Sequence, residues 1–160
     1  MTVNDLSEPQ RRGRCADEKA IRDLLDRQIE AWNAGDPDAY AGAYVPGGDC
    51  VSFLGSHYQG REAIAESSEV PRAASLLKKL IRGARLDFQV TQLKFLTSDV
   101  ALVHATGGIS KGSAPSRRNV RTNTTIAVRT GDGWLIAVSH NTTQRPIAEK
   151  LLRKLVSRQP

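Results

Sequence analysis

The sequence has 160 residues, of which 39% are hydrophobic and 25% charged, and its formal net charge is +6. This length fits one domain with a buried core, and the composition excludes a disordered or fibrous chain. Nucleic-acid binding is also disfavoured, because the clustered basic residues have no interleaved aromatic residues that would stack on bases. A solvated basic surface is the better interpretation.

No membrane association is expected, since the stretches without charged residues, such as Val100 to Ser110, are too short to span a bilayer. The N-terminus has no apolar run behind its arginines and is not a secretory signal. We therefore expect a cytoplasmic protein in which Cys15 and Cys50 are free thiols.

The first third of the chain predicts a disordered arm and two helices. Residues 1–15 are polar and form the expected arm. From residue 16 apolar side chains recur at steps of three and four, which predicts an amphipathic helix that ends at Gly35. Asp36 followed by Pro37 predicts the start of a second helix, with Asp36 as its N-cap, that extends to about Tyr44.

The next segment predicts a buried strand and a third helix. After a turn at residues 46–48, Cys50–Leu54 is expected to be the strand. The helix should open at Gly60, be broken or kinked by Pro71 and end at Gly83.

The rest of the domain is strand-like and should form a meander. A flexible loop is expected at Lys111–Ser116, and Gly131-Asp132 predicts a tight hairpin. The expected strands are Leu86–Leu96, Val100–Ile109, Asn119–Thr130 and Trp134–Thr143.

Together these elements predict an α+β fold, in which a curved antiparallel sheet wraps around helices and leaves a pocket at its open end. We expect a single domain over residues 16–145 after the arm. Residues 146–160 should form a C-terminal helix whose apolar stripe packs on this domain or on a dimer mate, or docks into a partner's groove. The strands carry apolar residues on both faces, which predicts a homodimer through the convex face of the sheet.

Three segments carry a resemblance to a known family: AWNAGDPDAY at 31–40, GDCVSF at 48–53 leading through YQGREAI at 58–64, and GWLIAVSHNT at 133–142. They resemble the nuclear transport factor 2-like superfamily, its SnoaL-like branch and, within it, the SgcJ/EcaC group of enediyne and related natural-product clusters. The resemblance implies a cone-like domain with a ligand pocket, a polyketide-like ligand, and a polyketide synthase as a possible partner. The sequence has neither of the glycine-rich nucleotide-binding motifs, and we expect no cofactor.

Two functions remain open. The first is a binding or accessory protein that holds a polyketide intermediate, and the second is a cofactor-free isomerase, cyclase or dehydratase. Cyclases of the SnoaL type place a catalytic aspartate on a late strand, whereas this sequence has no Asp or Glu between Asp99 and Asp132. This difference favours the accessory protein.

If the chain is an enzyme, three residues are candidate general bases. Asp49 lies where the resemblance places the pocket mouth, although an ordinary turn aspartate bonded to the backbone is the simpler interpretation. His104 and His140 lie in mid-strand among apolar residues, where a histidine is either a base or an ordinary sheet-face residue. The widely spaced histidines predict no metal site.

Six further residues are candidate ligand contacts. The aromatic ones either wall a flat pocket or belong to the core, and the polar ones either line the pocket or pair across strands. We expect at least two of Asp49, His104, Asn123 and His140 to share one cavity walled by Trp32 and Tyr44. The six are Trp32, Tyr44, Phe53, Asn123, Thr125 and Asn141.

Overall fold

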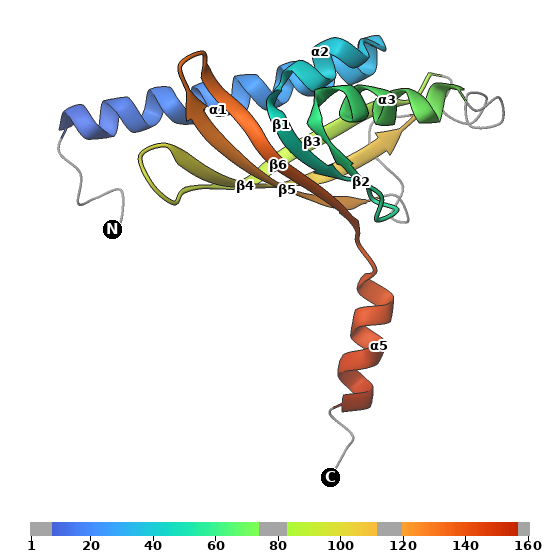
Figure 1. The fold of residues 1–160 in the computed structure, drawn as a ribbon. Coiled ribbons are helices and arrows are strands. Elements are labelled where there is room, and N and C mark those ends of the chain that lie inside the picture. The colour runs from blue at the N-terminus through green and yellow to red at the C-terminus, as the bar shows by residue number, and fades with distance from the viewer. Residues whose placement is uncertain (1–7, 74–82, 112–119, 157–160) are drawn as a thin grey trace.

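A six-stranded curved sheet, in the order β2-β1-β6-β5-β4-β3, organises the chain (Figure 1). The computed structural model describes residues 8–73, 83–111 and 120–156. The elements are α1 (Glu8–Ala34), α2 (Pro37–Gly42), β1 (Tyr44–Val51), β2 (His57–Gln59), α3 (Gly60–Ala73), β3 (Arg85–Phe95), β4 (Val100–Ser110), β5 (Arg121–Thr130), β6 (Gly133–Thr143) and α5 (Pro146–Val156).

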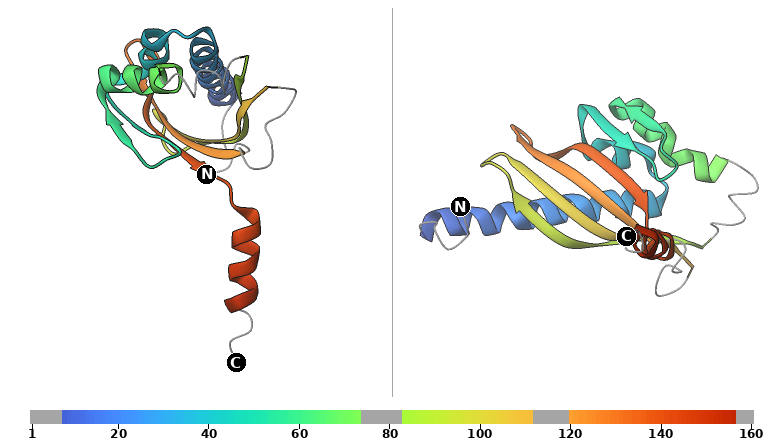
Figure 2. Two further views of the ribbon diagram at one scale, coloured as in Figure 1. Left: turned by 90° about the vertical axis from the view of Figure 1, so that its right-hand side faces the viewer. Right: turned by 90° about the horizontal axis from the view of Figure 1, so that it is seen from below.

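The helices α1, α2 and α3 cover the concave face of this sheet, which we call the inner face (Figures 1 and 2). No described helix packs on the convex face, and α5 projects away from the body on that side. This arrangement confirms the predicted α+β class. The sheet is antiparallel except that β1 and β6 run parallel, which the sequence did not predict.

The junction between α1 and α2 confirms the sequence interpretation. Gly35 adopts φ 79°, a conformation that glycine tolerates best, and its N–H donates to Ala31 O at 3.0 Å. The Asp36 carboxylate then accepts from the Ala39 N–H at 2.9 Å, as an N-cap should. The predicted hairpin is also confirmed, since Thr130 pairs with Gly133.

The structure differs from the sequence prediction at the N-terminus, where α1 begins at Glu8 and residues 8–15 are helical. Tertiary contacts explain the difference: the Arg14 guanidinium lies 4.3 Å from the centroid of the Phe95 ring and donates to Thr97 O at 3.2 Å. These contacts stabilise a helical turn that polar composition alone does not favour. The rest of the expected arm, residues 1–7, lies outside the described residues.

Two further boundaries differ. Tyr44 begins β1 instead of ending α2. β1 also includes the proline and glycines at 46–48 that predicted a turn, and the register of its pairing with β6 shifts across these residues. α3 continues through Pro71 to Ala73 without a break. The expected end of this helix and most of the loop at Lys111–Ser116 lie outside the described residues.

The core lies between α1 and the inner face. Ile21 and Leu24 of α1 and Ile64 of α3 are buried against strand residues that include Val103 and Ile136. Burial alternates along β4, where Ala101, Val103 and Ala105 face inward, so the residues between them face the convex side. This alternation decides which side chains can reach a cavity under the helices.

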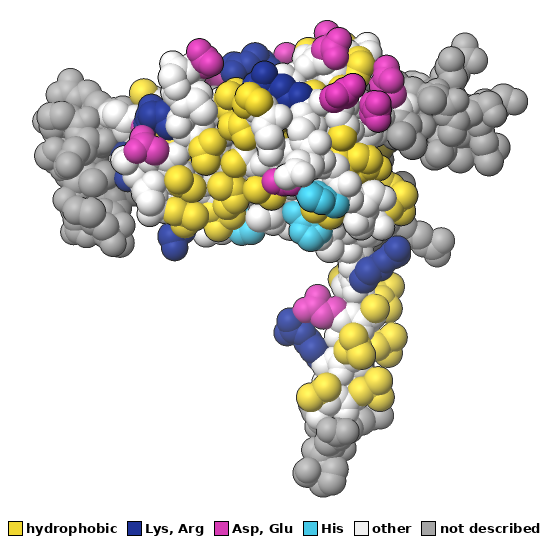
Figure 3. Space-filling view, viewed as in Figure 1, with side chains coloured by type: hydrophobic (Ala, Val, Ile, Leu, Met, Phe, Trp, Pro, Cys, Tyr) yellow, Lys and Arg dark blue, Asp and Glu magenta, His cyan; other side chains and the backbone are white. Residues whose placement is uncertain are grey.

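α5 contributes nothing to this core. None of its residues is buried, and its apolar stripe is exposed, from 57% for Leu151 to 77% for Ile147. The expectation that this helix packs on its own domain is therefore not met. Figure 3 shows the hydrophobic side chains gathered along one side of the helix.

Candidate ligand-binding cavity

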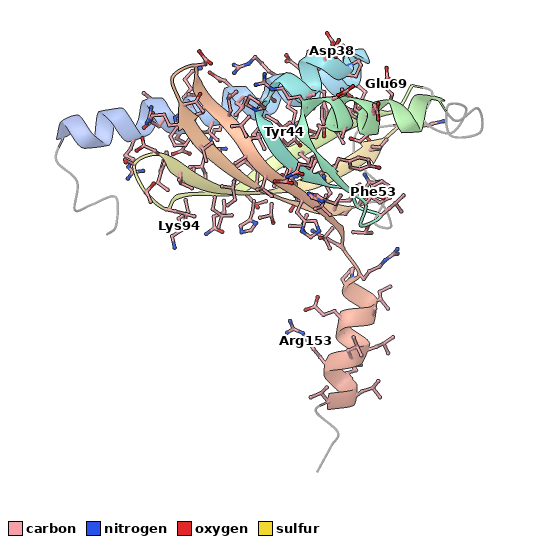
Figure 4. All side chains as sticks on the ribbon, viewed as in Figure 1. Asp38, Tyr44, Phe53, Glu69, Lys94 and Arg153 are labelled. Carbon is pink, nitrogen blue, oxygen red and sulfur yellow. The ribbon has the colours of Figure 1, made fainter. Side chains whose placement is uncertain are left out.

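A cavity of about 190 Å³ lies between the helices and the inner face of the sheet. Exposed lining residues in the β1–β2 turn, such as Phe53 and Leu54, mark its mouth; Figure 4 shows Phe53 near the end of the body where β6 leads into α5. The apolar and aromatic lining comprises Leu25, Ile29, Trp32, Tyr40, Cys50, Phe53, Leu54, Tyr58, Leu86, Phe88, Val90, Ala105 and Ile109. The polar lining comprises Asp26, Gln28, Ser52, Ser56, Ser67, Ser68, Arg121, Asn123, Ser139 and Asn141.

A bulge in β6 places polar side chains on the cavity wall. Ile126 pairs with Val138 while Ala127 pairs with Ile136, so Ala137 is an extra residue in β6. Before the bulge Trp134 and Ile136 are buried on the inner face. Beyond it the alternation shifts by one residue, and Ser139 and Asn141 face inward instead.

These polar side chains form one hydrogen-bonded row. The Asn123 Nδ2 donates to Ser139 Oγ at 3.1 Å and to Asn141 Oδ1 at 3.2 Å, and its Oδ1 accepts from the Thr125 hydroxyl at 2.8 Å. The row fixes the orientation of Asn123. Within the described part of the chain the Asn141 NH₂ group makes no hydrogen bond and can donate into the cavity.

Tyr40 and Cys50 add a phenol and a thiol to the wall, and both groups stay protonated. Burial raises the pKa of the Tyr40 phenol and of the Cys50 thiol above their ordinary values. Tyr44 lies behind them, with its ring centroid 6.2 Å from that of Tyr40, and burial raises its pKa as well. Its hydroxyl is buried beside Ser139 and Cys50 and has no partner with good hydrogen-bond geometry among the described residues.

The mouth carries a stacked cation. The Arg121 Cζ lies 3.5 Å from the centroid of the Phe53 ring, and burial lowers the pKa of this guanidinium. Arg121 forms no ion pair with any described residue. Asp26 is the single carboxylate among the described lining residues, and it lies on α1.

Four of the six predicted ligand contacts line the cavity: Trp32, Phe53, Asn123 and Asn141. Tyr44 and Thr125 do not, because they are 0% and 1% exposed and are covered by neighbouring side chains. Figure 4 places Tyr44 between the sheet and the helices, away from the mouth.

Asp49 lies outside the cavity. Its neighbour Cys50 points inward, so the side chain of Asp49 points to the convex face, where its Oδ1 lies 2.6 Å from His57 Nε2. It is a strand residue with a side-chain partner, neither the pocket carboxylate nor the turn residue that the sequence suggested. His57 received no role in the sequence analysis.

His104 and His140 also face away from the cavity. Val103 and Ala105 are buried on either side of His104, which therefore points to the convex face, where its Nδ1 lies 3.1 Å from Thr124 Oγ1. His140 is exposed beyond the β6 bulge. Of the four polar residues expected to share one cavity, only Asn123 lines it, because strand alternation directs the other three outward.

Sequence reasoning gave no site role to Arg121, Ser139 or Cys50, although all three line the cavity. The sequence feature that could have indicated a site role for Arg121 is its position two residues before Asn123 in a strand, because this spacing puts both side chains on the same face. No group of three or more His, Cys, Asp or Glu among the described residues is arranged to hold a metal ion. In that part of the chain no helix has the length and apolar character needed to cross a membrane.

The family model of the SnoaL-like domain matches residues 13–140. The chain belongs to this family. No curated protein matches the chain. Among solved structures, it is similar to a domain of unknown function with a cystatin-like fold from Nostoc punctiforme, with a TM-score of 0.72, 23% identity, and coverage of 91% of this chain and 88% of that chain.

A second similar structure is an NTF2-like protein with a cystatin-like fold from Novosphingobium aromaticivorans (TM-score 0.70, 23% identity, 94% of this chain and 99% of that chain). A third is a candidate dehydratase from the NTF2-like family from Streptomyces avermitilis (TM-score 0.60, 20% identity, 81% and 97%). At these identities the three neighbours show that the SnoaL-like chain shares their fold.

Proposed function

We propose that this SnoaL-like protein is a small-molecule-binding accessory protein, which holds a largely apolar, ring-bearing molecule in the cavity under its helices. The observation that carries the proposal is the chemistry of the wall. Aromatic and aliphatic side chains surround a few fixed polar groups, as is typical of small-molecule sites.

Binding fits this wall better than proton abstraction does. The phenol of Tyr40 and the thiol of Cys50 are kept neutral by burial, so they donate hydrogen bonds and do not act as bases. Asp49, His104 and His140 lie on the other side of the sheet from the cavity.

We further propose that this binding function serves a biosynthetic pathway. The resemblance of residues 31–64 and 133–142 to the SgcJ/EcaC group supports a role in enediyne-type polyketide biosynthesis in the cytoplasm, with a polyketide-like ligand and a synthase as partner. The alternative is a cofactor-free dehydratase, isomerase or cyclase. Asp26 on the cavity wall supports this alternative, since it supplies a carboxylate to the site.

A cavity-filling variant tests the binding function. Ala105 is 4% exposed and lines the cavity from β4, whereas its neighbour Thr106 faces the convex side. Ala105→Leu should abolish the saturation-transfer NMR signal of 1-naphthol or phenol, and Thr106→Leu should leave it unchanged. Equal signals in both variants would contradict binding in this cavity. Conversion of a polyketide by the wild type but not by Asp26→Asn would establish the enzymatic alternative.

We also propose that two copies associate through their convex faces. α5 leaves the body on this side (Figures 1 and 2), so a second copy stacked on the convex face would lie against the helix. The apolar stripe of α5 and the exposed Val138 of β6 supply surface for such an interface. Light scattering should give the molar mass of a dimer at micromolar concentration, and a clean monomer would contradict this arrangement.

A further inference from the structure

Arg121 and Phe53 form a cationic mouth on an otherwise largely apolar cavity. Phe53 comes from the β1–β2 turn and is 40% exposed, whereas Arg121 is the first residue of β5 and is half-buried. The 3.5 Å separation between the Arg121 Cζ and the ring centroid places the planar guanidinium over the aromatic face. Stacking of this kind uses the face of the guanidinium and leaves its five N–H donors in the plane available for other partners.

No carboxylate satisfies this cation within the described residues. The Arg121 side chain makes neither a hydrogen bond nor an ion pair with a described residue, and desolvation is the one cause that lowers the pKa of its guanidinium. Arg129, at the opposite end of β5, shows the contrast: it pairs with Asp17 and Asp99. The segments 74–82 and 112–119 contain no Asp or Glu in their sequence. A desolvated arginine without an acidic partner is a costly arrangement that an anionic ligand would compensate.

Neighbouring polar groups favour an oxygen-bearing anion. Asn141 lies on the same inner face of the adjoining strand. It is two residues from Thr143, the pairing partner of Arg121, and it pairs with Asn123. The Asn141 NH₂ group and the Arg121 guanidinium therefore offer donors to the same end of the cavity. Planar bidentate donors of the arginine type match a carboxylate in particular.

We infer that the ligand of this cavity is a ring-bearing carboxylate, which places its ring among the apolar walls and its carboxylate against Arg121 at the mouth. This inference rests on the proposed binding function. The volume of the cavity is large enough for such a ring, because a dry apolar cavity of about 150 Å³ accepts benzene in another protein. A cavity of about 190 Å³ with an open mouth therefore accommodates a ring whose charged substituent reaches the rim.

Benzoate and its neutral isostere benzamide are the probes that test this inference, because they differ mainly in charge. The affinities are measured by NMR titration at neutral pH for the wild type, Arg121→Gln and Arg85→Gln. Arg85 is the matched control, since it is an exposed arginine at the same end of the sheet and does not line the cavity. We expect the wild type to prefer benzoate. In Arg121→Gln the benzoate affinity should fall on the order of 10-fold to 100-fold while benzamide binding is unchanged, and Arg85→Gln should behave as the wild type.

Each other outcome overturns a distinct claim. Equal affinity of the wild type for benzoate and benzamide, or a benzoate preference that survives in Arg121→Gln, overturns the role of Arg121 while leaving the cavity as a binding site. If neither these probes nor 1-naphthol binds, the proposed function fails as well. Arg121→Lys provides a second variant should Arg121→Gln not fold: it keeps the charge and loses the planar fork, so benzoate affinity should still fall relative to the wild type.

Discussion

The side chain of Asn33 makes both hydrogen bonds to Leu86 that a neighbouring strand would make. Its Nδ2 donates to Leu86 O at 2.9 Å, and its Oδ1 accepts from Leu86 N at 2.7 Å. β3 is an edge strand of the sheet, so Asn33 caps an edge that would otherwise present unpaired backbone groups. It also joins the end of α1 to a residue of the cavity wall.

Asn33→Ala should therefore destabilise the fold and loosen the cavity rim. Loss of two part-buried hydrogen bonds should lower the free energy of unfolding by about 1–3 kcal/mol, which corresponds to several degrees in the melting temperature. Gln89→Ala is the control, because Gln89 is an exposed side chain of the same strand. Equal melting temperatures for the two variants, measured by circular dichroism, would show that the two hydrogen bonds do not stabilise the fold.

Gly107 should not tolerate a side chain. A Cβ at this position would lie 1.9 Å from Asp87 O and 2.6 Å from Phe88 Cα, both in the backbone of the adjacent strand. Because backbone atoms cannot rotate away, Gly107→Ala should cost roughly 1–3 kcal/mol or more through separation of β3 from β4. Gly47→Ala is the matched control, since nothing lies within 4 Å of its added Cβ. Similar denaturation midpoints for both variants would refute the close approach.

The buried phenol and thiol predict a loss of stability at alkaline pH. Burial raises the folded-state pKa of Cys50 above its ordinary 9.0 and that of Tyr40 above its ordinary 10.0. The folded chain then holds these protons more tightly than the unfolded chain does, so the stabilisation is complete below about pH 9 and declines as the pH rises above it. Tyr40→Phe should flatten the fall in melting temperature above about pH 10, where the phenol of the unfolded chain begins to lose its proton, because it removes one of these groups. A fall as steep as in the wild type would exclude Tyr40 as a source of the alkaline loss; Tyr58→Phe is the control substitution.

The sequence predicted those parts of the fold that local chemistry determines. Asp36 and Pro37 mark the start of α2 by capping alone, and the strands β3 to β6 follow from alternation and turn residues. Long-range contacts decide the rest. α1 extends to Glu8 through contacts of Arg14 with β3 and the turn that follows it, and β1 continues through two glycines because β6 lies beside it.

The site was harder to predict than the fold, because one inserted residue exchanges the two faces of a strand. The bulge at Ala137 turns Asn141 toward the cavity and His140 away from it, and nothing in the local sequence marks its position. The contact between Asp49 and His57 could not be predicted either, since His57 lies in a three-residue strand that is too short to give a periodic pattern. Side chains were therefore assigned to the right strands and, in part, to the wrong face.

The apolar stripe of α5 packs on no described residue of its own chain. Ile147, Leu151 and Leu155 follow one another at intervals of four residues, and all are more than half exposed. Fully burying such a side chain is worth roughly 1.5–3 kcal/mol, so a surface that covers several of them would be strongly favoured. In the proposed dimer that surface belongs to the second copy.

Removal of residues 146–160 should therefore weaken association while the isolated domain stays folded, because none of the residues of α5 is buried within its own chain. We expect the truncated protein to retain its circular dichroism spectrum and to need on the order of 100-fold higher concentration to dimerise. Leu151→Glu combined with Leu155→Glu should act as the truncation does, whereas Arg153→Ala, on the polar side of the helix, should not. Molar masses from light scattering over a range of concentrations provide the measurement. The same mass for full-length and truncated protein at every concentration would exclude α5 from the interface, and retained dimers would then be attributed to the sheet face alone.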